Sequence, residues 1–433
     1  MALLWWILIL FFSLSHQQPL SEQEALYQLL HSLNPSIPWR TLFPDHFCLS
    51  APHGVVCDYP SQHIVELNFG YVSDETPNPP CSPNATFNPL LFSSFPFLRK
   101  LFFYKCFNQT LTLTLTFPFP SLPPTLQELV FIHNPSFLPP LGTLLQNLTS
   151  LRRLVLIGNG FHGEIPPQLG DFIALEEVTL SGNNLGGEVP HSLGLLKKLK
   201  VLDLSGNRFE GCVSESLGNL TQLLKLDMSF NQFGCRIPES FRRLRSLEFL
   251  DLSFNRFANF GVPLFLREIP SLKEVYVSGN FLSGVIPEIW ENLGGIEKLG
   301  FSDMGLVGNI PASMGVYLKN LSYLGLDNNR LDGPVPPEFG LLEFADEINL
   351  ENNNLSGRVP LLTTKMGQKL KVAGNTGLCG VENKIIRCGS GQLKPCNKTD
   401  VPDAVLFGGA SQSMCSLILR FFLFLILFVF AGF

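Results

Sequence analysis

The stretch Leu199-Lys200-Val201-Leu202-Asp203-Leu204-Ser205-Gly206-Asn207 sets out a frame that the chain repeats about every 24 residues. In each copy, three apolar residues, three and two positions apart, lead to an asparagine. A turn of the form x-Leu/Phe-x-Gly-x-Ile/Val-Pro follows, as in Phe161–Pro166. Such regularity predicts stacked coils that each contact only their neighbours. The copies end at Asn134, Asn159, Asn183, Asn207, Asn231, Asn255, Asn280, Asn329 and Asn353, with Met304 in the slot after Asn280.

This repeat predicts a leucine-rich-repeat solenoid, an α/β right-handed curved superhelix of about 12 coils of ~24 residues between residues 64 and 375. Within a coil, Leu-x-x-Leu-x-Leu forms a short strand whose leucines point inward and whose intervening residues face outward. The strands of successive coils form one concave parallel β-sheet. The asparagine points into the turn, where its amide satisfies backbone groups that lack water. The 38 phenylalanines indicate that Phe shares the interior with Leu.

The segment before the repeats is expected to cap the solenoid. Ser21 and Glu24 form a capping box, and apolar residues follow at helical spacing until Pro35. We assign residues 16–63 to this N-terminal cap, residues 64–375 to the repeats and residues 376–396 to a C-terminal cap.

The ten cysteines predict disulfides that staple the caps and two neighbouring coils. Cys212 and Cys235 lie about one repeat apart, and parallel strands ~4.8 Å apart suit a disulfide. No Cys-x2-Cys pair suggests a metal site. The expected pairs are Cys48–Cys57, Cys81–Cys106, Cys212–Cys235 and Cys379–Cys388, with Cys396 and Cys415 unassigned.

Both ends of the chain indicate export. Residues 1–15 are almost wholly apolar and end in small residues, as in a secretory signal peptide, although an uncleaved anchor is the alternative. Seven sequons agree with passage through the secretory pathway and predict glycosylation at Asn84, Asn108, Asn147, Asn219, Asn320, Asn354 and Asn397.

The last 37 residues divide into a linker, residues 397–410, and an apolar tail, residues 411–433. Leu417 to Phe433 would give a helix of ~26 Å, short for a bilayer core of ~30 Å, and no Lys or Arg follows it. Small residues, a ten-residue spacer and an apolar end fit a GPI signal with attachment at Gly408. A single transmembrane helix and a free secreted form stay open as alternatives.

The concave positions of the repeat give the expected partner site. Aromatic side chains gather there in three successive coils, and exposed aromatics at the centre of a surface are common binding anchors. The alternative is that each ring only covers its neighbour. The predicted site comprises the aromatic patch Phe230, Phe249, Phe254 and Tyr276 and a more polar stretch with Lys298, Asp303, Tyr323, Asp327 and Glu351.

Other classes of site have little support. Asp203, Asp227 and Asp251 fall in the same slot of three coils, but no further carboxylate converges on them, so we expect no metal and no cofactor. The eight histidines are scattered outside any catalytic motif, so we expect no enzyme. A charged fraction of 15% and a net charge of -6 exclude a basic nucleic-acid surface.

Over residues 64–380, the consensus Leu-x-x-Leu-x-Leu-x-x-Asn-x-Leu-x-Gly-x-Ile-Pro-x-x-Leu-Gly resembles the plant extracellular class of leucine-rich repeat. The stretches Phe95–Cys106 and Leu154–Asn159 resemble receptor-like proteins of the Too Many Mouths and Piriformospora indica-insensitive group. This chain differs from larger receptor-like proteins in having no obvious island between repeats.

That resemblance implies a cell-surface receptor-like protein without a kinase domain, delivered by the secretory pathway to the extracellular face of the plasma membrane. Such a protein binds an extracellular peptide or protein ligand. It acts with a transmembrane receptor kinase that has a leucine-rich-repeat ectodomain, in plant development or defence. The alternative is a secreted inhibitor of microbial polygalacturonase-type enzymes, which has a similar repeat but no use for an apolar C-terminus.

Overall fold

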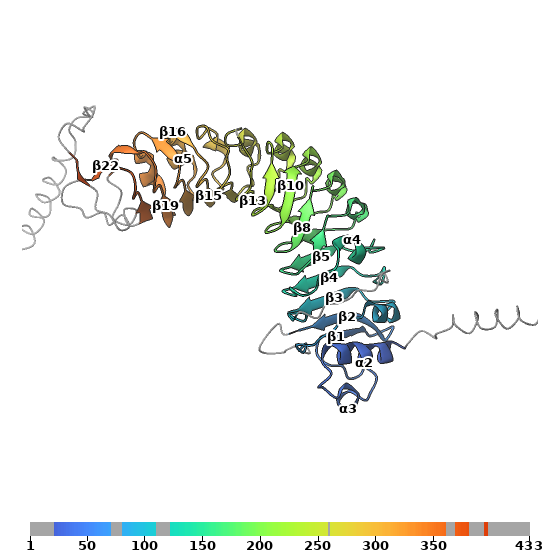
Figure 1. Ribbon diagram of the computed structural model, residues 1–433. Coiled ribbons are helices and arrows are strands. Elements are labelled where there is room, and N and C mark those ends of the chain that lie inside the picture. Colours follow the sequence, from blue (N-terminus) through green and yellow to red (C-terminus); the bar gives the residue numbers. More distant parts are fainter. Residues whose placement is uncertain are drawn as a thin grey trace, which may run out of the picture.

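The computed structural model describes residues 21–70, 80–109, 122–258, 260–360, 369–380 and 394–396. The chain forms a curved solenoid in which strands line the inner side of the arc and short helices and turns lie on the outer side (Figure 1). This architecture confirms the fold class predicted from the repeat.

The inner side is a 14-stranded sheet. Its first strand is antiparallel to the second, and the remaining neighbours pair in parallel, one per coil, which gives thirteen coils against about twelve expected. The strands, in spatial order, are β1 (Val55–Asp58), β2 (His63–Phe69), β3 (Lys100–Tyr104), β4 (Glu128–Ile132), β5 (Arg153–Ile157), β7 (Glu177–Thr179), β9 (Val201–Asp203), β11 (Lys225–Asp227), β13 (Phe249–Asp251), β14 (Glu274–Tyr276), β15 (Lys298–Gly300), β17 (Tyr323–Gly325), β19 (Glu347–Asn349) and β21 (Leu370–Lys371).

The leucines of the frame form one continuous core along the solenoid. Leu202, Leu226 and Leu250 pair in register in successive strands and are 0%, 1% and 0% exposed. Phenylalanines form a second line inside the coils, where the rings of Phe209 and Phe233 stack with centroids 6.2 Å apart. The first coils hold a denser cluster of buried rings, and these contacts confirm that Phe shares the interior with Leu: Phe69, Phe87, Phe103, Phe107, Phe131 and Phe137.

The asparagine ladder holds neighbouring coils together as predicted. The side-chain amide of Asn231 donates to the carbonyl of Leu204 in the preceding coil at 3.0 Å, and its oxygen accepts from the backbone N–H of Phe209 at 3.0 Å. Met304 cannot make such bonds. The backbone N–H groups of Met304 and Leu306 instead both donate to the side-chain oxygen of Asn329, at 3.1 Å and 3.0 Å.

Short helices cover the convex side because each Ile/Val-Pro turn leads the chain into a tight helical turn. Glycine after the leucine of these turns allows the coils to approach closely. A Cβ at Gly194 would lie 2.4 Å from the carbonyl oxygen of Ser216 in the next coil. The helices are η1 (Pro89–Ser94), α4 (Leu141–Leu144), η2 (Pro167–Asp171), η3 (His191–Leu195), η4 (Glu215–Asn219), η5 (Glu239–Arg243), η6 (Leu264–Glu268), η7 (Trp290–Asn292), α5 (Ala312–Tyr317) and η8 (Pro337–Leu341).

Three small parallel sheets form where the chain turns from the concave side towards the convex side. A four-stranded sheet, a two-stranded sheet and a three-stranded sheet follow one another along the solenoid. Their strands are β6 (His162–Gly163), β8 (Asn184–Gly187), β10 (Arg208–Cys212) and β12 (Gln232–Gly234); β16 (Val307–Asn309) and β18 (Arg330–Asp332); and β20 (Ser356–Arg358), β22 (Gly377–Gly380) and β23 (Lys394–Pro395).

The N-terminal cap contains α2 (Glu22–Leu33) and α3 (Trp39–Leu42). The Ser21 hydroxyl accepts from the backbone N–H of Glu24 at 3.3 Å, as the capping box predicts, and the apolar face of α2 is buried at the end of the solenoid. The Glu24 carboxylate itself pairs with Arg40. The helix therefore covers the apolar end of the first coil, as a solenoid requires.

Three of the four expected disulfides are present, namely Cys48–Cys57, Cys81–Cys106 and Cys212–Cys235, with Cα–Cα distances of 5.5, 4.9 and 5.3 Å. The expected Cys379–Cys388 pair is wrong, because Cys379 pairs with Cys396 at a Cα–Cα distance of 4.9 Å. Strand β23 lies beside β22, and the backbone N–H of Cys396 donates to Gly380, which brings this cysteine rather than the nearer one in sequence to Cys379. Cys388 and Cys415 lie outside the described residues.

Several sequence predictions also fall outside the described residues: the signal peptide, the sequon Asn397, the linker and the C-terminal tail with Gly408. Within the part of the chain that the structure describes, no helix has the length and apolar character needed to cross a bilayer.

Candidate ligand-binding surface

Three aspartates line the centre of the concave sheet, here called the aspartate line: Asp203, Asp227 and Asp251. They occupy the same slot of β9, β11 and β13 and pair in register. Asp203 and Asp227 are only 7% and 9% exposed. The line therefore places three partly desolvated carboxylates side by side.

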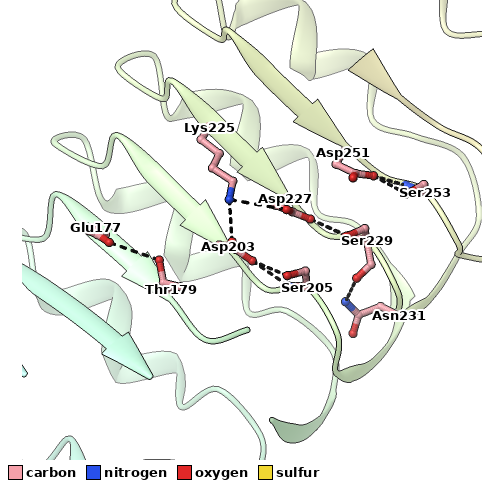
Figure 2. Close-up of polar contacts among 10 residues, drawn as sticks. All are labelled: Glu177, Thr179, Asp203, Ser205, Lys225, Asp227, Ser229, Asn231, Asp251 and Ser253. Atoms are coloured by element: carbon pink, nitrogen blue, oxygen red, sulfur yellow. Dashed lines mark hydrogen bonds and ion pairs between the residues drawn. The ribbon is translucent and has the colours of Figure 1, made fainter. Parts of the chain in front are cut away.

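Each of these aspartates ends its strand. The Oδ1 atom of Asp203 accepts from the backbone N–H and hydroxyl of Ser205, at 3.1 Å and 2.7 Å, and the same contacts recur at Asp227–Ser229 and Asp251–Ser253 (Figure 2). A side chain that caps its own backbone two residues on competes with extension of the strand. Strands β9, β11 and β13 accordingly stop after three residues.

Lys225 forms ion pairs with two aspartates of this line. The Lys225 Nζ atom lies 2.8 Å from Asp203 Oδ2 and 3.7 Å from Asp227 Oδ2, and Figure 2 shows it pointing to these two carboxylates. Burial lowers the pKa of Lys225, but its hydrogen bond to Asp203 and the charges of Asp203 and Asp227 outweigh this and raise the pKa. Burial, with the neighbouring carboxylate of Asp203, raises the pKa of Asp227.

Asp251 lacks such a partner. Among the residues that the structure describes, no basic nitrogen lies within the 4.0 Å of a salt bridge to its carboxylate. Its contacts are the hydrogen bonds to Ser253, and burial together with the charge of Asp227 raises its pKa. The carboxylate at this end of the line therefore has no direct ion pair within the described part of the chain, although the more distant charge of Lys225 acts to lower its pKa.

Two phenylalanines stand at the edge of the same surface, here called the phenylalanine pair: Phe230 and Phe254. They precede the asparagines of successive coils, and their rings stack with centroids 4.5 Å apart. They remain 57% and 50% exposed. The phenylalanine pair thus offers a large apolar face to a partner.

The backbone under this pair is strained. Both residues have a left-handed backbone, with φ of 54° and 53°. Left-handed backbone costs an ordinary L-residue about 1–2 kcal/mol, and only glycine, asparagine and aspartate adopt it readily. The slot holds those types in most other coils: Gly158, Gly182, Gly206, Gly279, Asp303, Asn328, Asn352 and Gly374.

The other two predicted aromatics lie on the strands. The rings of Phe249 and Tyr276 are 6.0 Å apart, and Tyr276 donates to Glu274 at 2.9 Å. The expected aromatic patch is therefore two ring pairs, one on the strands and one in the turns after them. Each pair also covers a neighbouring glycine: a Cβ at Gly300 would lie 2.7 Å from Tyr276.

The predicted polar stretch lies on the next coils. Lys298 pairs with Glu274 at 3.3 Å. Asp327 accepts from Ser302 at 2.5 Å and from Asn328 at 2.8 Å. Tyr323 and Glu351 are half-buried on neighbouring coils. The contacts of Lys298 and Asp327 are thus made with neighbouring residues of the solenoid.

The first coils also carry an apolar surface that was not predicted, here called the apolar N-terminal surface: Phe102, Tyr104, Val130, Ile132, Val155 and Ile157. These residues alternate with core residues along β3, β4 and β5, each five residues long. Val130 and Val155 are each 5% exposed, because neighbouring side chains cover them. A sequence pattern could have indicated this surface. Where the central coils have Leu-Asp-Leu-Ser, these coils have Leu-Phe-Phe-Tyr, Leu-Val-Phe-Ile and Leu-Val-Leu-Ile.

A second apolar set lies on the side of the solenoid, between the four-stranded and two-stranded sheets. Isolated β-bridges, Ala258–Phe281 and Val285–Val307, take the place of strand pairs there. One coil carries an extra residue, and its Phe260 lies under the Arg236 guanidinium at 5.4 Å. The set, here called the lateral apolar set, is 40–66% exposed and comprises Phe260, Phe281, Val285 and Val307.

Metal chemistry has no site within the described residues. No group of three or more His, Cys, Asp or Glu side chains is arranged there to hold a metal ion. At Asp203 and Asp227 the carboxylate oxygens are already in contact with the hydroxyls of Ser205 and Ser229 and with Lys225.

Comparisons with known proteins agree with this architecture. Two families, both described as leucine-rich repeat, match the chain at residues 173–233 and 197–257 and at residues 271–293 and 320–342. Protein TOO MANY MOUTHS of Arabidopsis thaliana is 35% identical over 158 residues, which is 36% of this chain and 26% of that protein. Piriformospora indica-insensitive protein 2 of the same plant is 33% identical over 143 residues, 32% of this chain and 33% of that protein.

A solved structure extends the likeness to most of the repeats. The Arabidopsis receptor kinase HAESA, in complex with the peptide hormone IDA and the co-receptor SERK1, is 30% identical with a TM-score of 0.58, over 68% of this chain and 48% of that one. The chain spans about a quarter to a third of the length of the two curated relatives. These matches confirm the resemblance to plant leucine-rich-repeat receptor-like proteins.

Proposed function

We propose that this chain, a leucine-rich-repeat protein similar to plant receptor-like proteins, binds an extracellular peptide or protein ligand and acts with a transmembrane receptor kinase in development or defence. The phenylalanine pair carries the proposal. Two strained, half-exposed stacked rings at the edge of the concave sheet cost stability, and such strain is retained where the exposed side chain has a use. The peptide hormone and co-receptor in the HAESA structure support a ligand and a partner of these kinds.

The ligand would contact four side chains: Phe230, Phe254, Phe249 and Tyr276. The first pair supplies exposed apolar area, and the second flanks Asp251 on the strands. Aromatic rings give large contact area with little loss of side-chain freedom, which suits binding anchors.

The kinase partner would use another surface. The lateral apolar set is exposed and lies away from the strands of the concave sheet, so a second protein could contact it while the ligand is bound. In this arrangement ligand and kinase meet on one rigid solenoid.

Delivery to the cell surface is part of the proposal. Residues 1–15 would be a signal peptide, 397–410 a linker and 411–433 a GPI signal or a membrane helix. The described sequons support export, because Asn84, Asn108, Asn147, Asn320 and Asn354 are exposed. Phosphatidylinositol-specific phospholipase C should release the protein from membranes if Gly408 carries the anchor; retention would favour the transmembrane helix.

The test is affinity purification of the tagged full chain from plant membranes, with the copurified proteins identified by mass spectrometry. The wild type should retain a receptor kinase with a leucine-rich-repeat ectodomain and its ligand. The Phe230→Ala/Tyr276→Ala variant should lose the ligand while still folding and being secreted.

Phe344→Ala is the matched control, because Phe344 is 65% exposed just after the convex helix η8. It should behave as the wild type. Full ligand retention by the double variant, or the absence of any receptor kinase from the wild-type sample, would contradict the proposal.

A further inference from the structure

The centre of the concave surface combines aromatic rings with one unpaired carboxylate. Asp251 lies two residues after Phe249 on β13 and directly opposite Tyr276 on β14. The rings of Phe249 and Tyr276 lie 6.0 Å apart at an angle of 52°. Asp251 therefore lies next to two aromatic residues on the same face of the sheet.

The charges of this region do not balance. Lys225 pairs with Asp203 and Asp227 but not with Asp251, and it lies nearest Asp203. On the far side, Glu274 is already paired with Lys298 and with the Tyr276 hydroxyl. Asp251 is left with hydroxyl and backbone donors from Ser253. Burying a carboxylate without a cation is unfavourable, so an added positive charge would be stabilised here.

One of the rings beside Asp251, that of Phe249, already accepts a cation from within the protein. The Lys225 ammonium lies 5.2 Å from the centroid of the Phe249 ring. A cation over an aromatic face and next to a carboxylate gains from both, and arginine can stack on a ring while it donates two hydrogen bonds. An acidic partner would meet uncompensated negative charge, so charge complementarity selects a basic one.

We propose that the central concave surface receives an arginine or lysine side chain from an extended peptide segment of the ligand. The cation pairs with Asp251 and contacts Phe249 and Tyr276, and an apolar residue of the same segment covers the phenylalanine pair. This inference rests on the proposed function and names the chemistry of its ligand.

The test uses a display library of random dodecapeptides, selected on the purified, glycosylated full chain. Selected peptides should be enriched in arginine or lysine together with an apolar residue. Replacing the arginine of a selected peptide by citrulline, which keeps the shape and removes the charge, should weaken binding at least ~10-fold.

Matched variants of this chain test which aspartate pairs with the cation of the peptide. Asp251→Asn keeps the Oδ1 acceptor for Ser253 and should weaken the same peptide at least ~10-fold. Asp203→Asn changes the equivalent slot, where Lys225 already neutralises the charge, and should weaken binding less than ~3-fold. Lys225→Met removes an internal competitor and should strengthen binding about 2- to 5-fold.

The outcomes separate the two proposals. Peptides that depend on Phe230 and Tyr276 but bind Asp251→Asn at wild-type strength would overturn the cation site and leave the proposed function standing. Enrichment of acidic or uncharged peptides would also overturn it. A library that yields no peptide dependent on Phe230 and Tyr276 would count against both.

Discussion

The strands β3, β4 and β5 and the strands β9, β11 and β13 share one leucine frame but present different side chains to the concave side. The first group has five-residue strands in which a charged residue is followed by apolar outward residues, of which Val130 and Val155 are buried. The second has three-residue strands that end in aspartates, and each aspartate is held by a serine. The same backbone thus supports a partly buried apolar surface at one end and a charged, aromatic surface at the centre.

The difference follows from single slots of the repeat. Valine and isoleucine favour extended backbone and pack on neighbouring strands, which lengthens β4 and β5. Aspartate followed two residues later by serine closes a local turn and shortens the strand. A solenoid can therefore change the character of its surface from coil to coil without changing its core.

Truncating a core leucine should lower the free energy of unfolding by a similar amount in both regions. Leu129→Ala in the first group and Leu226→Ala in the second each remove a side chain that is at most 1% exposed. Each should lower the free energy of unfolding by about 2–5 kcal/mol, because a cavity replaces packed methyl groups. Urea unfolding followed by circular dichroism measures this. A large loss in only one group would show that the two regions do not share one frame.

Exchanging the outward residues of the two groups should change the free energy of unfolding by unequal amounts. Val155→Asp places a carboxylate among apolar neighbours without a cation and should cost roughly 2 kcal/mol or more. Asp227→Val loses the hydrogen bonds to Ser229 but removes repulsion from Asp203 and Asp251, and should change stability by less than about 1 kcal/mol. The same urea titration compares them. Equal losses of unfolding free energy for the two substitutions would contradict the distinction between an apolar and a charged surface.

The aspartates of the central strands should also make stability depend on pH, with a smaller effect than the substitutions above. Burial and neighbouring carboxylates raise the pKa of Asp227 and Asp251, so the folded protein binds these protons more readily than the unfolded chain. Stability is therefore gained as pH falls through the raised folded pKa values, and the gain is complete below the unfolded value of about 3.9.

The Asp227→Asn/Asp251→Asn variant should lack this gain. The melting temperature is measured at pH 7 and at pH 4 for both proteins. On going from pH 7 to pH 4, the change in melting temperature should favour the folded state less in the variant than in the wild type. Identical shifts in the two proteins would show that these carboxylates do not titrate differently on folding.

Much of this architecture could be predicted from the sequence because the repeat constrains every coil in the same way. The leucines fixed the core, and the asparagines indicated which backbone groups they would bond. The Cys379 partner could not be predicted, since it depends on which segment lies beside β22 rather than on sequence distance.

The sequence pattern identified the residues of the candidate site but not how their side chains are arranged. The aromatic positions were visible in the frame, yet their division into two pairs depends on ring orientation. The sharing of Lys225 depends on a contact between neighbouring coils that no single repeat reveals. The left-handed backbone of Phe230 and Phe254 likewise follows from a turn that most coils build with glycine, asparagine or aspartate.

Hydrogen exchange measured by mass spectrometry, on the full chain with and without a bound library-selected dodecapeptide, tests the central claim most directly. Ligand binding should slow exchange in residues 225–230, 249–254 and 274–279 and leave residues 128–132 and 153–157 unchanged. Protection confined to the first coils, or spread along the convex helices, would contradict the assignment of recognition to the central concave surface.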